Sequence, residues 1–215
     1  ASINPWERHA GYQITNGQDE DISLLWLKIF AISKILVNGS GSSVHYRDFV
    51  YPQKFDGWPV AACIVCPGDV VYRVPTPSRM ATAVAGEQAK RLVVPVNAVD
   101  HEALSAYVSW LDRSPSVLSF TREHNDRYII KGNVGPGQDI RVAMSYDPGF
   151  GASDQNKKKL AVAKDPLGFL LIRGVPPGDV SVTLTYGPTW DFYVGWVLFA
   201  AGVVWAVVLW RKEGA

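Results

Sequence analysis

The apolar segment FYVGWVLFAAGVVWAVVLW, residues Phe192–Trp210, lies close to the C-terminus of the 215-residue chain. It contains no charged residue and no His, Asn, Gln or Pro. A helix of about 19 residues rises by about 28 Å, close to the hydrocarbon thickness of a bilayer. It also lacks the polar stripe that is typical of a helix on the surface of a globular domain. The sequence therefore predicts a transmembrane helix at residues 191–211.

Aromatic and basic residues at both ends of this segment fit membrane interfaces, where amphipathic rings and cations lie at headgroup level. The predicted interface anchors are Trp190, Tyr193, Trp196, Trp210, Arg211 and Lys212. The positive-inside rule places the basic tail, residues 212–215, in the cytoplasm and the bulk of the chain in the periplasm. The sequence thus predicts a single-pass protein of the inner (cytoplasmic) membrane. Because no exporting segment precedes the large outer part, we expect Ala1 to be a processed end.

Small residues on the predicted helix favour packing against other helices. Gly195, Gly202 and Ala206 lie near one face, and small residues four positions apart permit two helices to approach closely. We therefore expect docking against transmembrane helices of a larger protein complex, with membrane lipids as the alternative surroundings. The segment has no His, the usual axial ligand, so we expect no haem or chlorophyll on it. Contact of carotenoid or lipid with its surface stays open.

The remainder of the chain has the composition of a turn-rich β protein. Its 19 Gly and 14 Pro separate short runs rich in Val, Thr and Tyr. The formal net charge of +1 creates no strong electrostatic field, so we expect no nucleic-acid partner. The predicted fold class is mainly β (α+β): a β-meander or sandwich outer domain with two short helices and one C-terminal transmembrane helix.

Residues 1–115 are predicted to form an outer α+β region that begins irregularly. The apolar run Ile22–Phe30, with Asp21 as its N-cap, predicts a short helix. A second helix is predicted at residues 100–112, where apolar residues recur at i, i+3, i+4 and i+7. Short strands are predicted at residues 33–37, 44–50, 60–65, 70–74 and 80–84.

Residues 116–190 are predicted to form a membrane-apposed β-sandwich domain. In Asp139–Tyr146 and in Asp179–Tyr186, apolar and polar residues alternate with the period of a strand that has one buried face. Further strands are predicted at residues 117–123, 127–132 and 167–173. The lysine run Lys157–Lys159 is predicted to be a loop.

The chemically reactive residues form no convincing catalytic or metal site in the sequence. We therefore expect the chain to bind no cofactor. Cys63 and Cys66 form a CxxC pair, which indicates a redox pair, half a zinc site, a local disulfide or two buried apolar residues. No second CxxC pair completes a zinc site, so a disulfide or simple burial is favoured. Asp100 fits an N-cap better than an acid–base partner of Glu102. The glycines at 132, 135 and 137 lie between two predicted strands and indicate a turn, because a phosphate loop requires a following helix.

Several segments, in this order, resemble the C-terminal extracytoplasmic region and last transmembrane helix of YfhO-like polytopic membrane proteins. The matching residues are Leu24–Leu27, Ile35–Val37, Val71–Pro75, Pro77, Arg79, Tyr146–Phe150 (YDPGF), Gly174–Gly178 (GVPPG), Val182, Tyr186 and Pro188. That family belongs to the GT-C-type membrane glycosyltransferases, which use lipid-linked sugar donors. Phe150 stands where Trp is usual, and the polar segment 152–159 departs from the family pattern. The family's catalytic carboxylates lie between earlier membrane helices that this chain lacks, so the resemblance implies a non-catalytic remnant.

Three functions are compatible with these patterns, and none makes this chain an enzyme. The first, which we favour, is a non-catalytic accessory or structural subunit of a larger membrane protein complex, such as a photosynthetic reaction centre or a respiratory complex. The second is the extracytoplasmic module of a membrane glycosyltransferase. The third is a surface carbohydrate-binding domain, which would require an exposed Trp6, Trp58 or Trp110 as a stacking platform.

Overall fold

A computed structural model describes residues 4–213, except 40, 44, 46, 66–67, 77, 114–115, 117 and 189. Side chains at 65, 190–191 and 206–213 also lie outside the description. The elements are α1 (Pro5–Asn16), α2 (Glu20–Ile29), β1 (Lys34–Asn38), η1 (Pro52–Phe55), β2 (Val60–Val65), β3 (Asp69–Arg73), β4 (Ala81–Ala85), α3 (Gly86–Ala89), α4 (His101–Asp112), β5 (Ser119–His124), β6 (Arg127–Val134), β7 (Gln138–Ser145), β8 (Phe150–Ser153), β9 (Lys159–Lys164), β10 (Phe169–Arg173), β11 (Gly178–Tyr186) and α5 (Trp190–Glu213).

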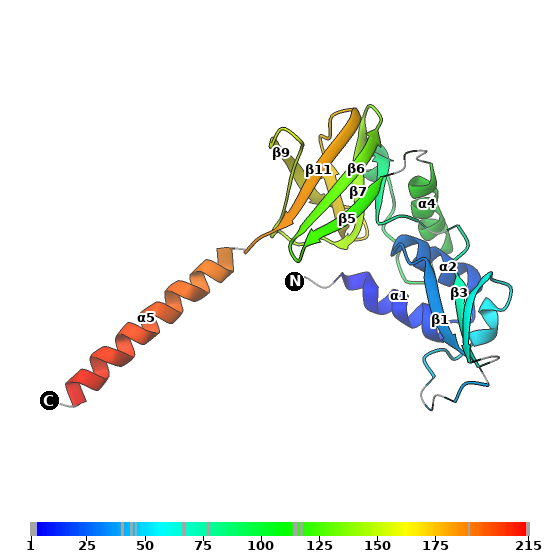
Figure 1. The fold of residues 1–215 in the computed structure, drawn as a ribbon, viewed down its shortest axis with the longest axis horizontal. Helices are drawn as coiled ribbons and strands as arrows, with labels where there is room; N and C mark the ends of the chain where they lie inside the picture. The colour runs from blue at the N-terminus through cyan, green and yellow to red at the C-terminus, as the bar shows by residue number, and fades with distance from the viewer. Residues whose placement is uncertain are drawn as a thin grey trace.

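The strands form two antiparallel sheets. The larger has eight strands in the order β4-β7-β10-β9-β8-β11-β6-β5, and the smaller has three in the order β1-β3-β2. Figure 1 shows the larger sheet beside the N-terminal helices and the small sheet, with α5 projecting away from it. Strand β4 comes from the N-terminal half of the chain and pairs with β7, Ala83 opposite Ile140. The N-terminal part of the chain therefore contributes one strand, β4, to the eight-stranded sheet.

Strand β10 separates two hydrophobic cores. Leu170 and Ile172 belong to a core enclosed by the curled eight-stranded sheet, which we call the sheet core. Phe169 and Leu171 point to the other side, into a core formed with α1, α2, α4 and the small sheet, which we call the helical core. Because side chains alternate along a strand, a strand buried on both faces must be apolar throughout, and β10 begins Phe-Leu-Leu-Ile.

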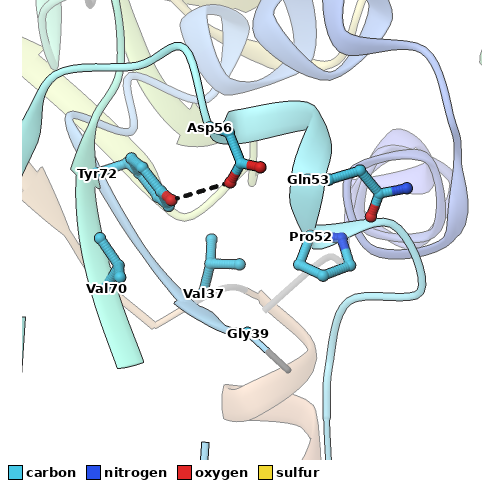
Figure 2. A pocket seen from close by; sticks show the side chains of 7 residues that line it. All are labelled: Val37, Gly39, Pro52, Gln53, Asp56, Val70 and Tyr72. Atoms are coloured by element: carbon cyan, nitrogen blue, oxygen red, sulfur yellow. Dashed lines mark hydrogen bonds between the residues drawn. The ribbon is translucent and has the colours of Figure 1, made fainter. Parts of the chain in front are cut away.

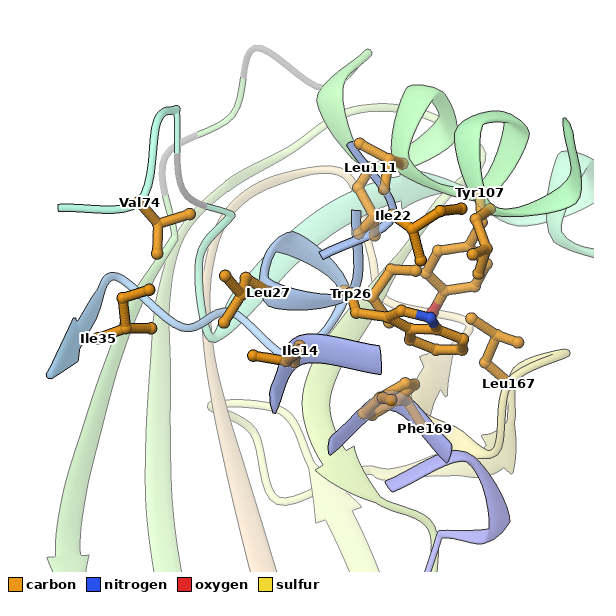
Figure 3. Close-up of a cluster of buried hydrophobic side chains, with 14 of the residues drawn as sticks. Ile14, Ile22, Trp26, Leu27, Ile35, Val74, Tyr107, Leu111, Leu167 and Phe169 are labelled. Atoms are coloured by element: carbon orange, nitrogen blue, oxygen red, sulfur yellow. The ribbon is translucent and has the colours of Figure 1, made fainter. Parts of the chain in front are cut away.

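The helical core is built around Trp26 of α2, whose side chain is completely buried (Figure 3). Its indole stacks on Trp6 of α1 with ring centroids 5.7 Å apart, and its Nε1 donates a 2.8 Å hydrogen bond to the carbonyl of Ala98. Lys28 of α2 forms a 2.6 Å ion pair with Asp112 of α4. These contacts fix α1, α2 and the segment that leads into α4 against one another.

Several predicted elements are confirmed, and others are wrong at identifiable positions. Helices α2 and α4 lie where expected, and Asp100 caps α4 by accepting from the amide of Ala103, but the cap of α2 is Asp19, not Asp21. Helix α1 replaces a predicted irregular segment. Strands β8 and β9 lie on either side of residues 154–158, where no strand was predicted. No strand occurs within the described residues of 44–50.

The structure is mainly β, but the predicted fold class is wrong in its transmembrane helix. Within the part of the chain that the structure describes, no helix has both the length and the apolar character needed to cross a membrane. The predicted single-pass placement in the inner membrane, and the predicted orientation, depended on that helix. Both predictions are therefore wrong.

Candidate functional site

Helix α5 carries the largest group of exposed apolar side chains among the described residues. Ten large apolar residues between Phe192 and Trp205 are 43–68 % exposed. They occur on all sides of the helix, whose sequence has no polar stripe in this part. Isolated exposed apolar residues are common on proteins, but a continuous apolar surface marks an interaction site. Helix α5 is therefore the first candidate functional surface.

The predicted contact residues on α5 are only partly described. Gly195 and Gly202 are exposed, and a Cβ added to either would meet no atom within 4 Å. Tyr193 and Trp196 are 59 % and 58 % exposed. The side chains of the other predicted contact and anchor residues lie outside the description: Trp190, Ala206, Trp210, Arg211 and Lys212.

A compact junction at the end of β11 precedes α5. The amide of Gly187 donates to the carbonyl of Gly149 (2.9 Å), and the amide of Tyr186 donates to the carbonyl of Asp126 (2.7 Å). The rings of Phe150 and Tyr186 pack edge to face with centroids 4.9 Å apart. The end of β11 is thus attached both to the β7–β8 turn and to the β5–β6 hairpin. Two separate sequence motifs, YDPGF and the Tyr-x-Pro segment that begins at Tyr186, therefore meet at this junction.

Replacing Gly149 with Ala is expected to lower the free energy of unfolding by about 1–3 kcal/mol. A Cβ at this position would lie 2.7 Å from the carbonyl oxygen of Gly187 and 2.8 Å from the Tyr186 ring, so the backbone of the junction must shift. Urea denaturation measures the change. Gly187→Ala is the matched control, because a Cβ there meets nothing within 4 Å, and it should stay within about 0.5 kcal/mol of wild type. Equal effects of the two substitutions would contradict this account of the junction.

A buried ionic group joins the two cores. Arg141 of β7 is completely buried; its Nη2 donates to the carbonyl of Ile29 (2.6 Å), and its Nε lies 3.7 Å from a carboxylate oxygen of Asp165. Tyr107 of α4 donates to Asp165 and accepts from Arg141 Nε. The Arg141 guanidinium also lies 4.2 Å from the centroid of the Phe169 ring. This group connects β7, α2, α4 and the β9–β10 turn.

Burial controls the protonation of this group. Loss of solvation raises the pKa of Asp165, although the positive charge of Arg141 partly offsets the effect. Burial also raises the pKa of the Tyr107 hydroxyl well above its usual value. Both oxygens of Asp165 are engaged, since Oδ1 accepts from the amides of Leu167 and Phe169. The group is enclosed by the fold and makes its contacts within it, so we assign it to stability.

A small polar pocket lies between η1 and the small sheet (Figure 2). It has a volume of about 250 Å³. Tyr72 donates a 3.3 Å hydrogen bond to Asp56 at its wall, and burial together with the Asp56 carboxylate raises the pKa of that hydroxyl. Val37 and Val70 supply apolar wall. Asp56 and Tyr72 are the only titratable residues among the described residues that line this pocket. The described lining therefore does not form a recognisable catalytic site.

The other residues singled out from the sequence are distributed over the fold. Trp58 and Trp110 are only 5 % and 3 % exposed, so neither is a stacking platform. Trp6 is half-buried at the edge of the helical core. Cys63 is disulfide-bonded, whereas its predicted partner Cys66 lies outside the described residues. No group of three His, Cys, Asp or Glu side chains in the described part could hold a metal ion.

Comparison with protein-family models, curated proteins and solved structures finds no match to this chain. The resemblance to YfhO-like proteins therefore stays a prediction from the sequence.

Proposed function

We propose that the chain is a non-catalytic accessory subunit of a larger protein complex, attached to that complex through α5. The observation that carries the proposal is the apolar surface of α5, exposed from Phe192 to Trp205. A helix that is apolar on all sides is normally surrounded by other apolar surface. The partner should therefore enclose much of the helix instead of touching it on one face.

The junction supports this proposal, because it fixes the end of β11 a few residues before α5 begins. Hydrogen bonds from Tyr186 and Gly187 hold the end of β11 against two neighbouring turns. When α5 is bound, the eight-stranded sheet would consequently be carried close to the partner's surface. The sheet would then act as a cover for that surface, which requires rigidity and no chemistry of its own.

Native purification of the tagged chain in mild detergent, followed by size-exclusion chromatography and mass spectrometry, tests the proposal. We expect the chain to migrate with other polypeptides at a fixed stoichiometry. Leu198→Lys combined with Phe199→Lys places two charges on side chains that are 67 % and 63 % exposed, and should reduce recovery of the partners at least tenfold. Val60→Lys is the control, since Val60 is 58 % exposed on β2 and distant in sequence from α5. A chain that migrates alone, or a double variant that retains its partners, would show that the proposal is wrong.

A second candidate function is that of a non-catalytic module of a sugar-transferring protein. Its support is that residues of two motifs behind the YfhO-like resemblance, Phe150 and Tyr186, pack together at the junction. The same purification distinguishes the two candidates. Recovery of a glycosyltransferase polypeptide as the main partner would favour the second, and recovery of a multi-subunit complex without one would favour the first.

A further inference from the structure

A cleft lies between the first turn of α1 and the segment that leads into α4. It has a volume of about 360 Å³ and is lined by Pro5, Trp6, His9, Val96, Asn97 and Ala98. This volume is at the lower end of the range for small-molecule sites, so it suits a ligand of about one ring. The cleft is formed by the N-terminal part of the fold and does not involve α5.

The α1 side of the cleft is held in place by the cap of the helix. Asn4 is only 2 % exposed, and its Oδ1 accepts from the amide of Trp6 at 2.9 Å. Its Nδ2 donates to the carbonyl of Leu167 at 3.0 Å. The start of α1 is thus tied to the β9–β10 turn, and the residues of its first turn have a fixed position.

The opposite side is also fixed by hydrogen bonds. Trp26 donates through its indole Nε1 to the carbonyl of Ala98 at 2.8 Å. The amide of Val96 donates to Asp100 (3.1 Å), and the amide of Val99 donates to Oδ1 of Asn97 (2.9 Å). Both walls therefore exist before any ligand arrives, which lowers the entropic cost of binding.

The lining of the cleft combines an aromatic wall with polar side chains. The half-buried Trp6 ring stacks on Trp26, and the ring of His9 stands edge-on to it with centroids 6.2 Å apart. His9 and Asn97 are exposed side chains that supply an imidazole and a carboxamide. None of the lining residues is Lys, Arg, Asp or Glu. We propose that this cleft binds one ring of a neutral pyranoside, with its C–H face on Trp6 and its hydroxyls on His9 and Asn97.

The alternatives fit the lining less well. A charged ligand would lack the opposite charge of a Lys, Arg, Asp or Glu side chain, because none of these lines the cleft. A purely aromatic ligand would use the Trp6 ring but would leave the polar groups of His9 and Asn97 without a role. A pyranoside uses both, since one of its faces carries C–H groups while its edge carries hydroxyls.

Saturation-transfer-difference NMR on the full chain tests the proposal. The probes are methyl β-glucopyranoside, methyl β-galactopyranoside and indole, in a detergent without a sugar headgroup. We expect saturation of at least one glycoside, and a loss of at least fivefold in both Trp6→Ala and His9→Ala. Asn97→Asp keeps the oxygen that accepts from Val99 and removes the amide donors, so it should also weaken the signal. Tyr12→Ala is the control, because Tyr12 is 62 % exposed on the same helix and does not line the cleft.

Each result decides the question. His9→Ala alters an exposed side chain, so it remains informative if Trp6→Ala, which removes a stacking partner of Trp26, fails to fold. Glycoside saturation that falls in His9→Ala and persists in Tyr12→Ala supports the proposal. Saturation of indole alone, of no probe, or of a glycoside to the same extent in wild type and His9→Ala would overturn it. None of these outcomes depends on whether α5 binds a partner.

Discussion

Replacing Arg141 with Met is expected to lower the free energy of unfolding by about 3–5 kcal/mol. Arg141 is completely buried, and its loss leaves the 4 %-exposed Asp165 without its cationic partner. The carbonyl of Ile29 also loses the donor that now lies 2.6 Å away. Met retains most of the side-chain volume, so the destabilisation reports the lost charge and hydrogen bonds instead of a cavity.

Urea denaturation followed by far-UV circular dichroism measures this effect. Arg122→Met is the matched control: Arg122 is exposed on β5, and its replacement should change the unfolding free energy by no more than about 0.5 kcal/mol. Asp165→Asn in the Arg141→Met background removes the stranded carboxylate but keeps an oxygen for the amides of Leu167 and Phe169. The double variant should therefore recover about 1–3 kcal/mol relative to Arg141→Met. A loss below about 1 kcal/mol in the single variant would show that Arg141 does not hold the two cores together.

The position of Arg141 illustrates what strand periodicity predicts and what it leaves undetermined. Alternation in β7 correctly predicted that Ile140 and Val142 share a buried face. It also made Arg141 look solvent-exposed, because a single strand does not reveal that helices cover its other face. The apolar run Phe169–Ile172 in β10 carried that information, since a strand with apolar residues on both faces belongs to a sheet covered on both sides. Combining the two strands would have indicated that Arg141 needs a buried partner.

Helix α1 and the hairpin of β8 and β9 were not predicted, although both have local signals in the sequence. Asn4 caps α1 and Pro5 occupies its first turn, a combination typical of a helix start. Around Asp154, whose carboxylate accepts from the amides of Asn156 and Lys158, the chain makes a tight turn between β8 and β9, with Lys157 at a φ of 62°. The hairpin was therefore not predicted, because its polar residues indicated a loop.

The candidate sites depend on contacts between segments distant in the sequence, and no local pattern predicts these. The junction joins residues near 126, 149 and 187, and the cleft joins α1 to residues 96–98. The apolar character of α5 was evident from the sequence, whereas its point of attachment was not. The sequence also did not separate the three candidate platforms: Trp58 and Trp110 are buried, whereas Trp6 is half-buried.

Trp26→Ala is expected to lower the free energy of unfolding by about 3–5 kcal/mol, mainly because it leaves a large cavity in the helical core. Trp26 has no exposed surface, and its ring contacts both Trp6 and Phe30. The same denaturation experiment measures the loss. Trp196→Ala is the matched control, because Trp196 on α5 is 58 % exposed and the substitution is identical. It should leave the unfolding free energy within about 0.5 kcal/mol of wild type.

Trp26→Phe separates packing from hydrogen bonding in the same position. Phe retains an aromatic ring for Trp6 but removes the indole N–H that donates to Ala98. The expected loss is consequently smaller than for Ala: about 1–3 kcal/mol for the unpaired carbonyl and the reduced volume. Because Ala98 lines the cleft, Trp26→Phe should also weaken glycoside binding while the fold persists. If Phe and Ala destabilise the protein equally, the hydrogen bond to Ala98, and not the packing of the ring, is the main contribution of Trp26.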